Sequence, residues 1–219
     1  MDKTEFEHPY VTVDVLIFSI RNKQLSTLLI RRSDDPFKGS FAIPGGFVQM
    51  NETLDKAAKR VIDQKGHQNN LYLEQLYSFG DLDRDPRGRV VSVAYLALVP
   101  QDNAIDVDDG KHVIKWFPVK TLPPLAFDHE KIITYAVERI KSKLGYSNIA
   151  ANLLPEKFRL TELQQIYEMV LGRPLDKRNF RKKMASLNLL EPLDELLSVG
   201  QHRPAQLYRF REKGLIIFN

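Results

Sequence analysis

The stretch between Pro44 and Lys65 has the layout of a catalytic helix without its chemistry. Apolar residues recur there at helical spacing and predict a helix at about 53–64. Positions 61, 64 and 65 share one face of that helix, where three carboxylates could bind a hard divalent cation such as Mg²⁺. The side chains present are Val61, Gln64 and Lys65, which are apolar, neutral and cationic. We therefore predict no metal site and no catalytic residues on this helix.

The residues before those positions keep a recognisable spacing. Glu52 follows Gly46 after five residues, and Arg60 follows Glu52 after seven more. This spacing resembles the first half of a Nudix box, a motif that continues with glutamates at the three replaced positions. The resemblance implies the fold of a Nudix domain without hydrolysis. The alternative is an active hydrolase of nucleoside diphosphate derivatives with an accessory basic domain.

A second pattern indicates an anion site. Gly45 and Gly46 form a turn with Pro44, and we expect this turn to lead into a helix N-terminus, where free N–H groups and the helix dipole favour an anion. Arginines in or beside the predicted loops at the sheet edge would then suit a diphosphate. These are Arg31, Arg32, Arg84, Arg87 and Arg89. Any one of them, taken singly, is better explained as a solvated surface arginine.

Apolar patterning predicts the elements that hold these residues. Alternating or continuous apolar runs indicate strands at 11–20, 25–30, 41–43, 73–81, 90–99 and 113–118. Helical spacing indicates helices at 53–64 and 129–143. A sheet with helices packed on it is an α/β sandwich. We expect a ligand-sensing domain at 1–145, a linker at 146–155 and a smaller domain at 156–219.

The last third of the chain is predicted to form a helix, a turn, a second helix and a hairpin. Thr161 and Gln164 predict a capping box at the start of the first helix, and Gly172 predicts its end. Asp176 predicts the N-cap of the second helix. The buried stripe of that helix is expected at Phe180, Met184 and Leu187.

Basic residues lie opposite that stripe. The segment 173–184 holds six basic residues against one acid. Arginine can read guanine, asparagine can read adenine, and lysine neutralises phosphate, so the second helix suits the major groove of DNA. Strands expected at 196–199 and 206–210 would carry a cationic tip beside it, as in a winged helix. The alternatives are a basic surface without a DNA partner and a scaffold that binds another protein.

Composition and charge agree with this division. A chain of 219 residues with 43% apolar and 27% charged residues should bury a core. It has no cysteine, and we expect a cytoplasmic protein with no cofactor. No apolar run approaches the about 18 residues of a membrane span. The net charge of +4 lies in residues 155–219, which hold 12 Lys and Arg against 8 Asp and Glu. This asymmetry is typical of a nucleic-acid partner, but charge alone fits a solvated basic surface equally well.

The chain as a whole resembles the Nudix-related transcriptional regulators of NAD metabolism, the NrtR family. The pieces that carry the resemblance are PFKGSFAIPGGF (36–47), RDPRGR (84–89), LAFDH (125–129), LDKRNFRKK (175–183) and RPAQLYRF (203–210). The resemblance implies a homodimer that binds double-stranded operator DNA through two winged helices. It also implies an effector, which is ADP-ribose or a related nucleotide in this family and a sugar in related regulators with degenerate Nudix domains.

Carried onto this sequence, the resemblance implies two sets of site residues. The effector would contact Arg32, Gly45, Gly46, Arg84, Arg87, Phe127 and His129. DNA would contact Lys177, Arg178, Asn179, Arg181 and Lys182 in the reading helix, and His202, Arg203 and Pro204 at the wing tip. The replaced glutamates leave the identity of the effector open.

Overall fold

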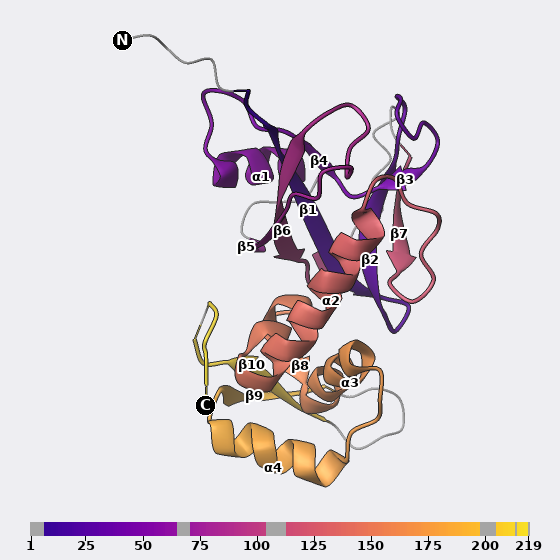
Figure 1. Cartoon of the computed structure of the whole chain (residues 1–219). Coiled ribbons are helices and arrows are strands. Elements are labelled where there is room, and N and C mark those ends of the chain that lie inside the picture. Colours follow the sequence, from indigo (N-terminus) through magenta and orange to yellow (C-terminus); the bar gives the residue numbers. More distant parts are fainter. Residues whose placement is uncertain (1–6, 65–70, 104–112, 198–204, 213, 219) are drawn as a thin grey trace. The chain divides into compact units, whose positions relative to one another are not determined.

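The computed structural model describes residues 7–64, 71–103, 113–197, 205–212 and 214–218. These residues form two compact units (Figure 1). The described residues of 1–18, 26–97 and 105–136 make the first unit, and those of 19–25, 98–104 and 137–219 make the second. No helix among the described residues is both long enough and apolar enough to cross a membrane.

A seven-stranded sheet organises the first unit. Its main path runs β3-β2-β1-β6-β5, while β4 pairs with β1 and β7 pairs with β2. The strands are β1 (Tyr10–Arg21), β2 (Gln24–Arg31), β3 (Phe41–Ala42), β4 (Gly45–Phe47), β5 (Tyr72–Phe79), β6 (Val90–Leu98) and β7 (Ile114–Pro118). The strand predictions are confirmed to within a few residues, and only the short β4 was not predicted.

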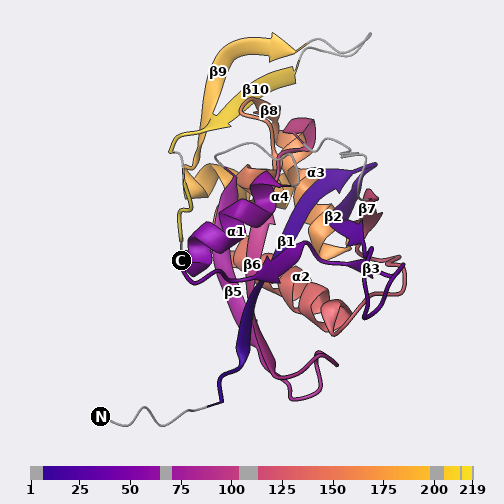
Figure 2. The ribbon, with the colours of Figure 1, turned by 90° about the horizontal axis from the view of Figure 1, so that it is seen from above.

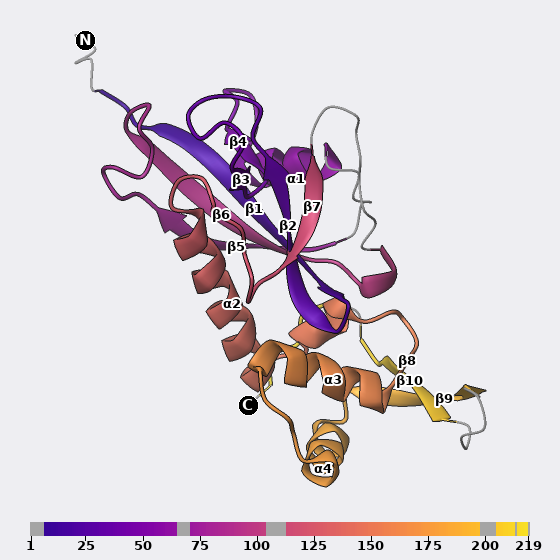
Figure 3. The same cartoon turned by 90° about the vertical axis from the view of Figure 1, so that its right-hand side faces the viewer.

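Strand β1 carries the core of the sheet. Val13, Val15, Leu16 and Ile17 are fully buried, because β1 is covered on both faces. A strand in such a position is a nearly continuous apolar run, and this is why it was recognisable in the sequence. Helices α1 (Leu54–Asp63) and α2 (His129–Tyr146) lie on opposite sides of the sheet (Figure 3). The predicted α/β/α sandwich is confirmed.

The start of α1 is fixed by capping contacts. The Oγ1 of Thr53 accepts a hydrogen bond from the backbone N–H of Lys56 at 3.3 Å, and Thr53 is therefore the N-cap. Glu52 receives a two-point ion pair from Arg60, which also donates to the carbonyl of Phe47 at 3.1 Å. The first half of the Nudix box thus has a structural role: Glu52 and Arg60, the Glu52–Arg60 clamp, tie α1 to β4.

The C-terminal part of the second unit, from Phe158 onward, consists of two helices and a three-stranded sheet. The strands are β8 (Phe158–Arg159), β9 (Leu190–Leu197) and β10 (Ala205–Phe210), with β10 between the other two (Figure 2). Helices α3 (Leu160–Leu171) and α4 (Lys177–Leu187) bury one face each, and Tyr167 of α3 meets Phe180 of α4 edge to face at 5.3 Å. This is the predicted helix-turn-helix with a hairpin, and the winged-helix architecture is confirmed. The strand predicted at 196–199 was placed too late, since β9 begins at Leu190, and β8 was not predicted.

The helix ends of this unit follow the sequence signals in all but one case. Gly172 ends α3 in the left-handed region at φ 72°, and the Asp176 carboxylate accepts from the backbone N–H of Asn179 at 2.7 Å. The predicted cap at Thr161 is wrong. Helix α3 begins one residue earlier, and the Glu162 carboxylate accepts from the backbone N–H of Arg159 at 2.6 Å. Position 161 is therefore already helical, and its hydroxyl cannot act as the N-cap.

The segment expected as a linker has a defined structure. Helix α2 continues to Tyr146, and a short 3-10 helix, η2 (Ile149–Leu153), follows it. Ile149, Ala150 and Leu153 are buried, and the side chain of Asn148 binds the backbone of Ile216. The division into 1–145, 146–155 and 156–219 remains a prediction, but residues 146–155 pack as part of the second unit.

Candidate functional site

A cavity of about 290 Å³ opens in the first unit beside β1 and β4. All seven residues predicted to contact the effector line it, namely Arg32, Gly45, Gly46, Arg84, Arg87, Phe127 and His129. They come from segments as far apart as β2 and the start of α2. The structure thus brings the predicted set together, while Arg31 and Arg89 hydrogen-bond to loop carbonyls outside the cavity lining.

One wall of the cavity combines arginines with an aromatic ring. The guanidinium carbon of Arg32 lies 4.9 Å from the centre of the Phe127 ring, and that of Arg87 lies 5.5 Å from the same centre. Burial lowers the pKa of Arg32, and the charge of Arg87 lowers it further. Two cations that disfavour each other in this way provide a position that an anion would stabilise.

The two arginines differ in how they are held. Arg32 donates to the carbonyl oxygens of Pro36 at 2.7 Å and of Asp34 at 3.2 Å. Arg87 makes a two-point ion pair with the Asp85 carboxylate at 2.9 and 2.7 Å. The Arg87 hydrogen bond lowers the pKa of Asp85. The positive charge of Arg87 is therefore paired with a carboxylate, whereas Arg32 is held by neutral carbonyl oxygens and its charge is balanced less directly.

Arg84 lies deeper and belongs to a buried polar network. Its guanidinium donates to both oxygens of Asp128 at 3.1 and 2.8 Å, and it lies 3.6 Å from Asp14 Oδ2. Its side chain is only 4% exposed, so it is not a solvated surface residue. A buried ion pair of this kind holds the loop 80–89 against the start of α2.

The two glycines have different roles. A Cβ on Gly45 would lie 2.3 Å from Asp14 Oδ1 and 2.6 Å from the carbonyl oxygen of Val13, whereas a Cβ on Gly46 would meet nothing within 4 Å. Gly45 is therefore required by close contact with β1. The expectation that these glycines lead directly into a helix N-terminus is wrong, because they form β4 and pair with β1 in antiparallel register, well before the N-cap at Thr53.

Several cavity residues were not predicted. Thr12, Asp14, Phe47 and Asp85 line the cavity beside the predicted set. Asp14 could have been found, since it is a single charged residue within an otherwise apolar run that predicts a buried strand. The others carry no such signal in the sequence.

The helix that would bear catalytic carboxylates presents other groups. Val61 is 2% exposed and packs in the core, while Gln64 is exposed. Lys65 lies outside the described residues. Among the residues that are described, no group of three or more His, Asp and Glu side chains could hold a metal ion.

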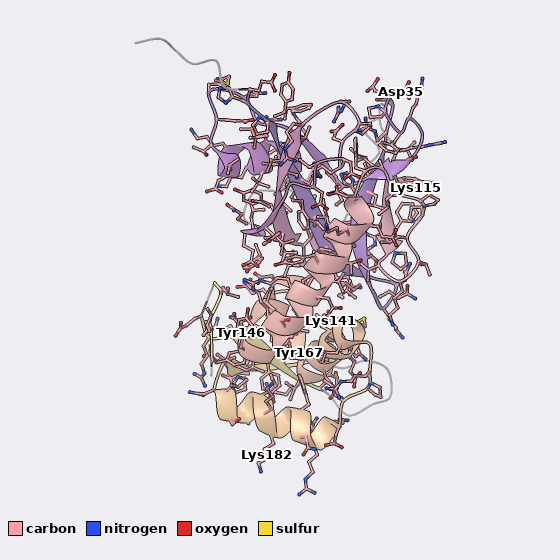
Figure 4. The ribbon with its side chains drawn as sticks, viewed as in Figure 1. Asp35, Lys115, Lys141, Tyr146, Tyr167 and Lys182 are labelled. Atoms are coloured by element: carbon pink, nitrogen blue, oxygen red, sulfur yellow. The ribbon has the colours of Figure 1, made fainter. Side chains whose placement is uncertain are left out.

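The exposed face of α4 carries the residues predicted to contact DNA. Phe180 and Met184 are buried, and the side chains on the opposite face are exposed (Figure 4). The exposed set is Lys177, Arg178, Asn179, Arg181 and Lys182. In Figure 4 the labelled Lys182 points away from the body of the second unit. His202, Arg203 and Pro204, predicted for the wing tip, lie outside the described residues.

Two family models match the chain. A NUDIX domain matches residues 10–136, and the NrtR DNA-binding winged helix domain matches residues 150–210. Over 213 residues the chain is 39% identical to the ADPR responsive transcriptional repressor NtrR of Acinetobacter baylyi, covering 95% of this chain and 84% of that protein. Over 126 residues it is 41% identical to the ADP-ribose pyrophosphatase of Methanocaldococcus jannaschii, covering 58% of this chain and 72% of that protein.

The fold matches solved structures of Shewanella oneidensis NrtR. The structure of that protein with a 27mer DNA has a TM-score of 0.81 at 35% identity and covers 92% of this chain and 93% of that chain. Its NUDIX domain with ADP ribose has a TM-score of 0.52 at 35% identity and covers 64% of this chain and 94% of that chain. Both units of the chain therefore have counterparts, one solved with DNA and one with a nucleotide sugar.

Proposed function

We propose that this chain, which belongs to the NrtR-like family of Nudix-related transcriptional regulators, is a repressor controlled by a nucleotide sugar. It binds double-stranded operator DNA through α4 and the hairpin that follows. ADP-ribose, or a related nucleotide or sugar, binds in the cavity of the first unit and releases the DNA. The repressor name of the Acinetobacter relative and the DNA and ADP ribose complexes of the Shewanella protein support both halves of the proposal.

The observation that carries the proposal is the combination of a cavity lined by arginines with a helix, α1, that lacks the metal-binding glutamates needed for catalysis. Arg32 and Arg87 flank Phe127 and suit a phosphate next to a planar ring. On α1, in contrast, Val61 points into the core where a metal-binding glutamate would stand. A domain with this arrangement retains the ligand without cleaving it.

The exposed face of α4 supports the DNA half. Its arginines and lysines can neutralise phosphates, and the exposed side chains of Asn179 and Arg178 are of the types that read base edges. A reader of this size covers one half-site, so the active form is a homodimer on a two-fold operator. Such a regulator works in the cytoplasm, where its operator lies.

The test is a binding titration with a ligand arm. A duplex selected from a random pool by the full-length protein is labelled, and binding is followed by fluorescence anisotropy with and without ADP-ribose. We expect tight binding that ADP-ribose weakens and that adenosine does not change. If the protein selects no sequence from the pool, the DNA half of the proposal is wrong. If it binds a selected DNA with an affinity that ADP-ribose, related nucleotides and pentoses do not change, the effector half is wrong.

A second candidate function is hydrolysis of ADP-ribose, because one relative is named as a pyrophosphatase and the Glu52–Arg60 clamp is present. Product release from ADP-ribose is measured with Mg²⁺ and with Mn²⁺. We expect the native protein to release product no faster than a Glu52→Gln variant does. Turnover that Glu52→Gln abolishes would establish the hydrolase instead.

A further inference from the structure

Asp14 is a charged residue inside a strand that is otherwise core. Its neighbours Val13 and Val15 are fully buried, and its own side chain is 9% exposed. Its Oδ2 atom accepts a hydrogen bond from the hydroxyl of Ser92 and lies 3.6 Å from Arg84. A polar group so buried needs hydrogen-bond or ion-pair partners, and Oδ2 has both.

The other oxygen of Asp14 faces the cavity. It lies next to Gly45, where a Cβ would approach it to 2.3 Å, and both residues line the cavity. Among the described residues no side chain or backbone N–H hydrogen-bonds to this Oδ1. The missing side chain at position 45 leaves an acceptor atom uncovered at the cavity wall.

His129 supplies a donor at the same place. Its Nδ1 accepts a hydrogen bond from the backbone N–H of Ile43 at 2.9 Å. An imidazole that accepts at Nδ1 carries its proton on Nε2 when it is neutral. Burial lowers the pKa of His129 and so favours that neutral form. The Nε2 donor lies 3.9 Å from Asp14 Oδ1, which is too far for a direct hydrogen bond.

A donor and an acceptor at this separation suit one chemical group in particular. A hydroxyl accepts from Nε2–H and donates to Oδ1, whereas a phosphate oxygen can only accept and would be repelled by the carboxylate. We infer that Asp14 and His129 together bind a hydroxyl of the effector's terminal sugar, the sugar that the diphosphate joins to the nucleoside, with the phosphates toward Arg32 and Arg87. This inference rests on the proposed function and makes Asp14 the residue that selects a nucleotide sugar over a nucleoside diphosphate without that second sugar.

The order of the side chains in the cavity supports this orientation. Arg32 and Arg87 lie over the Phe127 ring. The centre of the His129 ring lies 5.3 Å from the centre of the same Phe127 ring, and its Nε2 lies 3.9 Å from Asp14 Oδ1. In a nucleotide sugar the terminal sugar is joined directly to the diphosphate, so phosphates at the two arginines place a sugar hydroxyl near His129 and Asp14.

The experiment compares ligands and one isosteric variant by calorimetry on the full-length protein. ADP-ribose, ADP and ribose 5-phosphate are titrated into the native protein and into Asp14→Asn. We expect the native protein to bind ADP-ribose with an affinity about 10-fold or more above that for ADP. This ratio corresponds to the free energy of one hydrogen bond to a charged group. Asp14→Asn should raise the dissociation constants of ADP-ribose and ribose 5-phosphate by about 10-fold or more. The dissociation constant of ADP should change by less than about threefold.

The outcomes separate this inference from the proposed function. If the native protein binds none of the three ligands, the proposed effector class is wrong. The inference is wrong if the native protein binds ADP-ribose and Asp14→Asn lowers the affinities for ADP-ribose and for ADP by the same factor. It is also wrong if Asp14→Asn lowers neither affinity. Should Asp14→Asn fail to fold, analogues of ADP-ribose lacking single hydroxyls of the second sugar test the native protein, and equal affinity for all of them would overturn the inference.

Discussion

The guanidinium carbon of Arg32 lies 4.9 Å from the centre of the Phe127 ring, and Phe127 itself has a backbone φ of 55°. A bulky residue rarely adopts this left-handed conformation, which persists only where the surroundings hold it. Phe37 packs edge to face on the same ring at 4.9 Å. The ring is thus held in place from two sides at the mouth of the cavity.

Removing the Arg32 charge should impair effector binding without affecting DNA binding. Arg32→Ala is expected to lower the affinity for ADP-ribose by about 10-fold or more, since a charge-assisted contact to phosphate is lost. Calorimetry measures the affinity, and anisotropy measures DNA binding by the ligand-free protein. Lys38→Ala is the control, because Lys38 is exposed on the same loop and lies outside the cavity lining. Equal losses in both variants would mean that only net charge matters.

Truncating the exposed arginines of α4 should weaken DNA binding. Arg178→Ala is expected to cost about 1–3 kcal/mol if the side chain reads a base, and Lys182→Ala should reduce the salt slope by about one if that lysine contacts a phosphate. Anisotropy titrations across a salt series give both quantities. Lys59→Ala, on the exposed side of α1, is the matched control. Native affinity in both α4 variants would exclude this helix as the reader.

The two cavity glycines offer a matched pair. Gly45→Ala places a methyl group 2.3 Å from Asp14 Oδ1, so β4 must move away from β1, and both stability and ADP-ribose affinity should fall. Gly46→Ala meets no protein atom within 4 Å and should leave stability near the native value. Urea unfolding and calorimetry measure the two effects. A Gly45→Ala protein as stable as the native one would show that close contact does not require this glycine.

Restoring a glutamate at position 61 should destabilise the fold. Val61 is 2% exposed, so Val61→Glu buries a charge without a partner and is expected to lower the free energy of unfolding by about 3 kcal/mol or more. Gln64→Glu, at the exposed C-cap of the same helix, should lower the free energy of unfolding by no more than about 1 kcal/mol, the size of an unfavourable interaction with the helix dipole. Urea unfolding compares the two variants. A stable Val61→Glu protein would indicate that position 61 can turn toward solvent.

His129 should make stability depend on pH. Burial lowers its pKa below the ordinary 6.5, so the unfolded chain takes up a proton before the folded protein does. Stability is therefore full above pH 6.5 and falls as the pH drops toward the folded pKa. His129→Asn keeps an acceptor for the Ile43 N–H and cannot titrate, so it should lack this part of the pH dependence. Unfolding of both proteins between pH 5 and 8 is the measurement, and parallel curves would contradict the prediction.

Local patterns were enough to identify most elements. The continuous apolar run of β1, the helical spacing of α1 and the cap at Asp176 each depend on neighbouring residues, so the sequence contains their signal. The cap at Thr161 was misplaced because Glu162, and not Gln164, is the third helical residue whose side chain accepts from the N-cap backbone, and this sets the N-cap at Arg159. Strand β4 was missed because two glycines carry no apolar pattern.

By itself the sequence determined the order of the elements, the basic face of α4 and the replacement of the metal-binding glutamates. These depend on residue types and on separations of a few positions. The partners of Asp14 and His129 were decided only by the tertiary structure, because Ser92 and Ile43 are 78 and 86 positions away from them. Contacts at such separations follow from which strands lie side by side in the sheet, and local patterns do not contain that information.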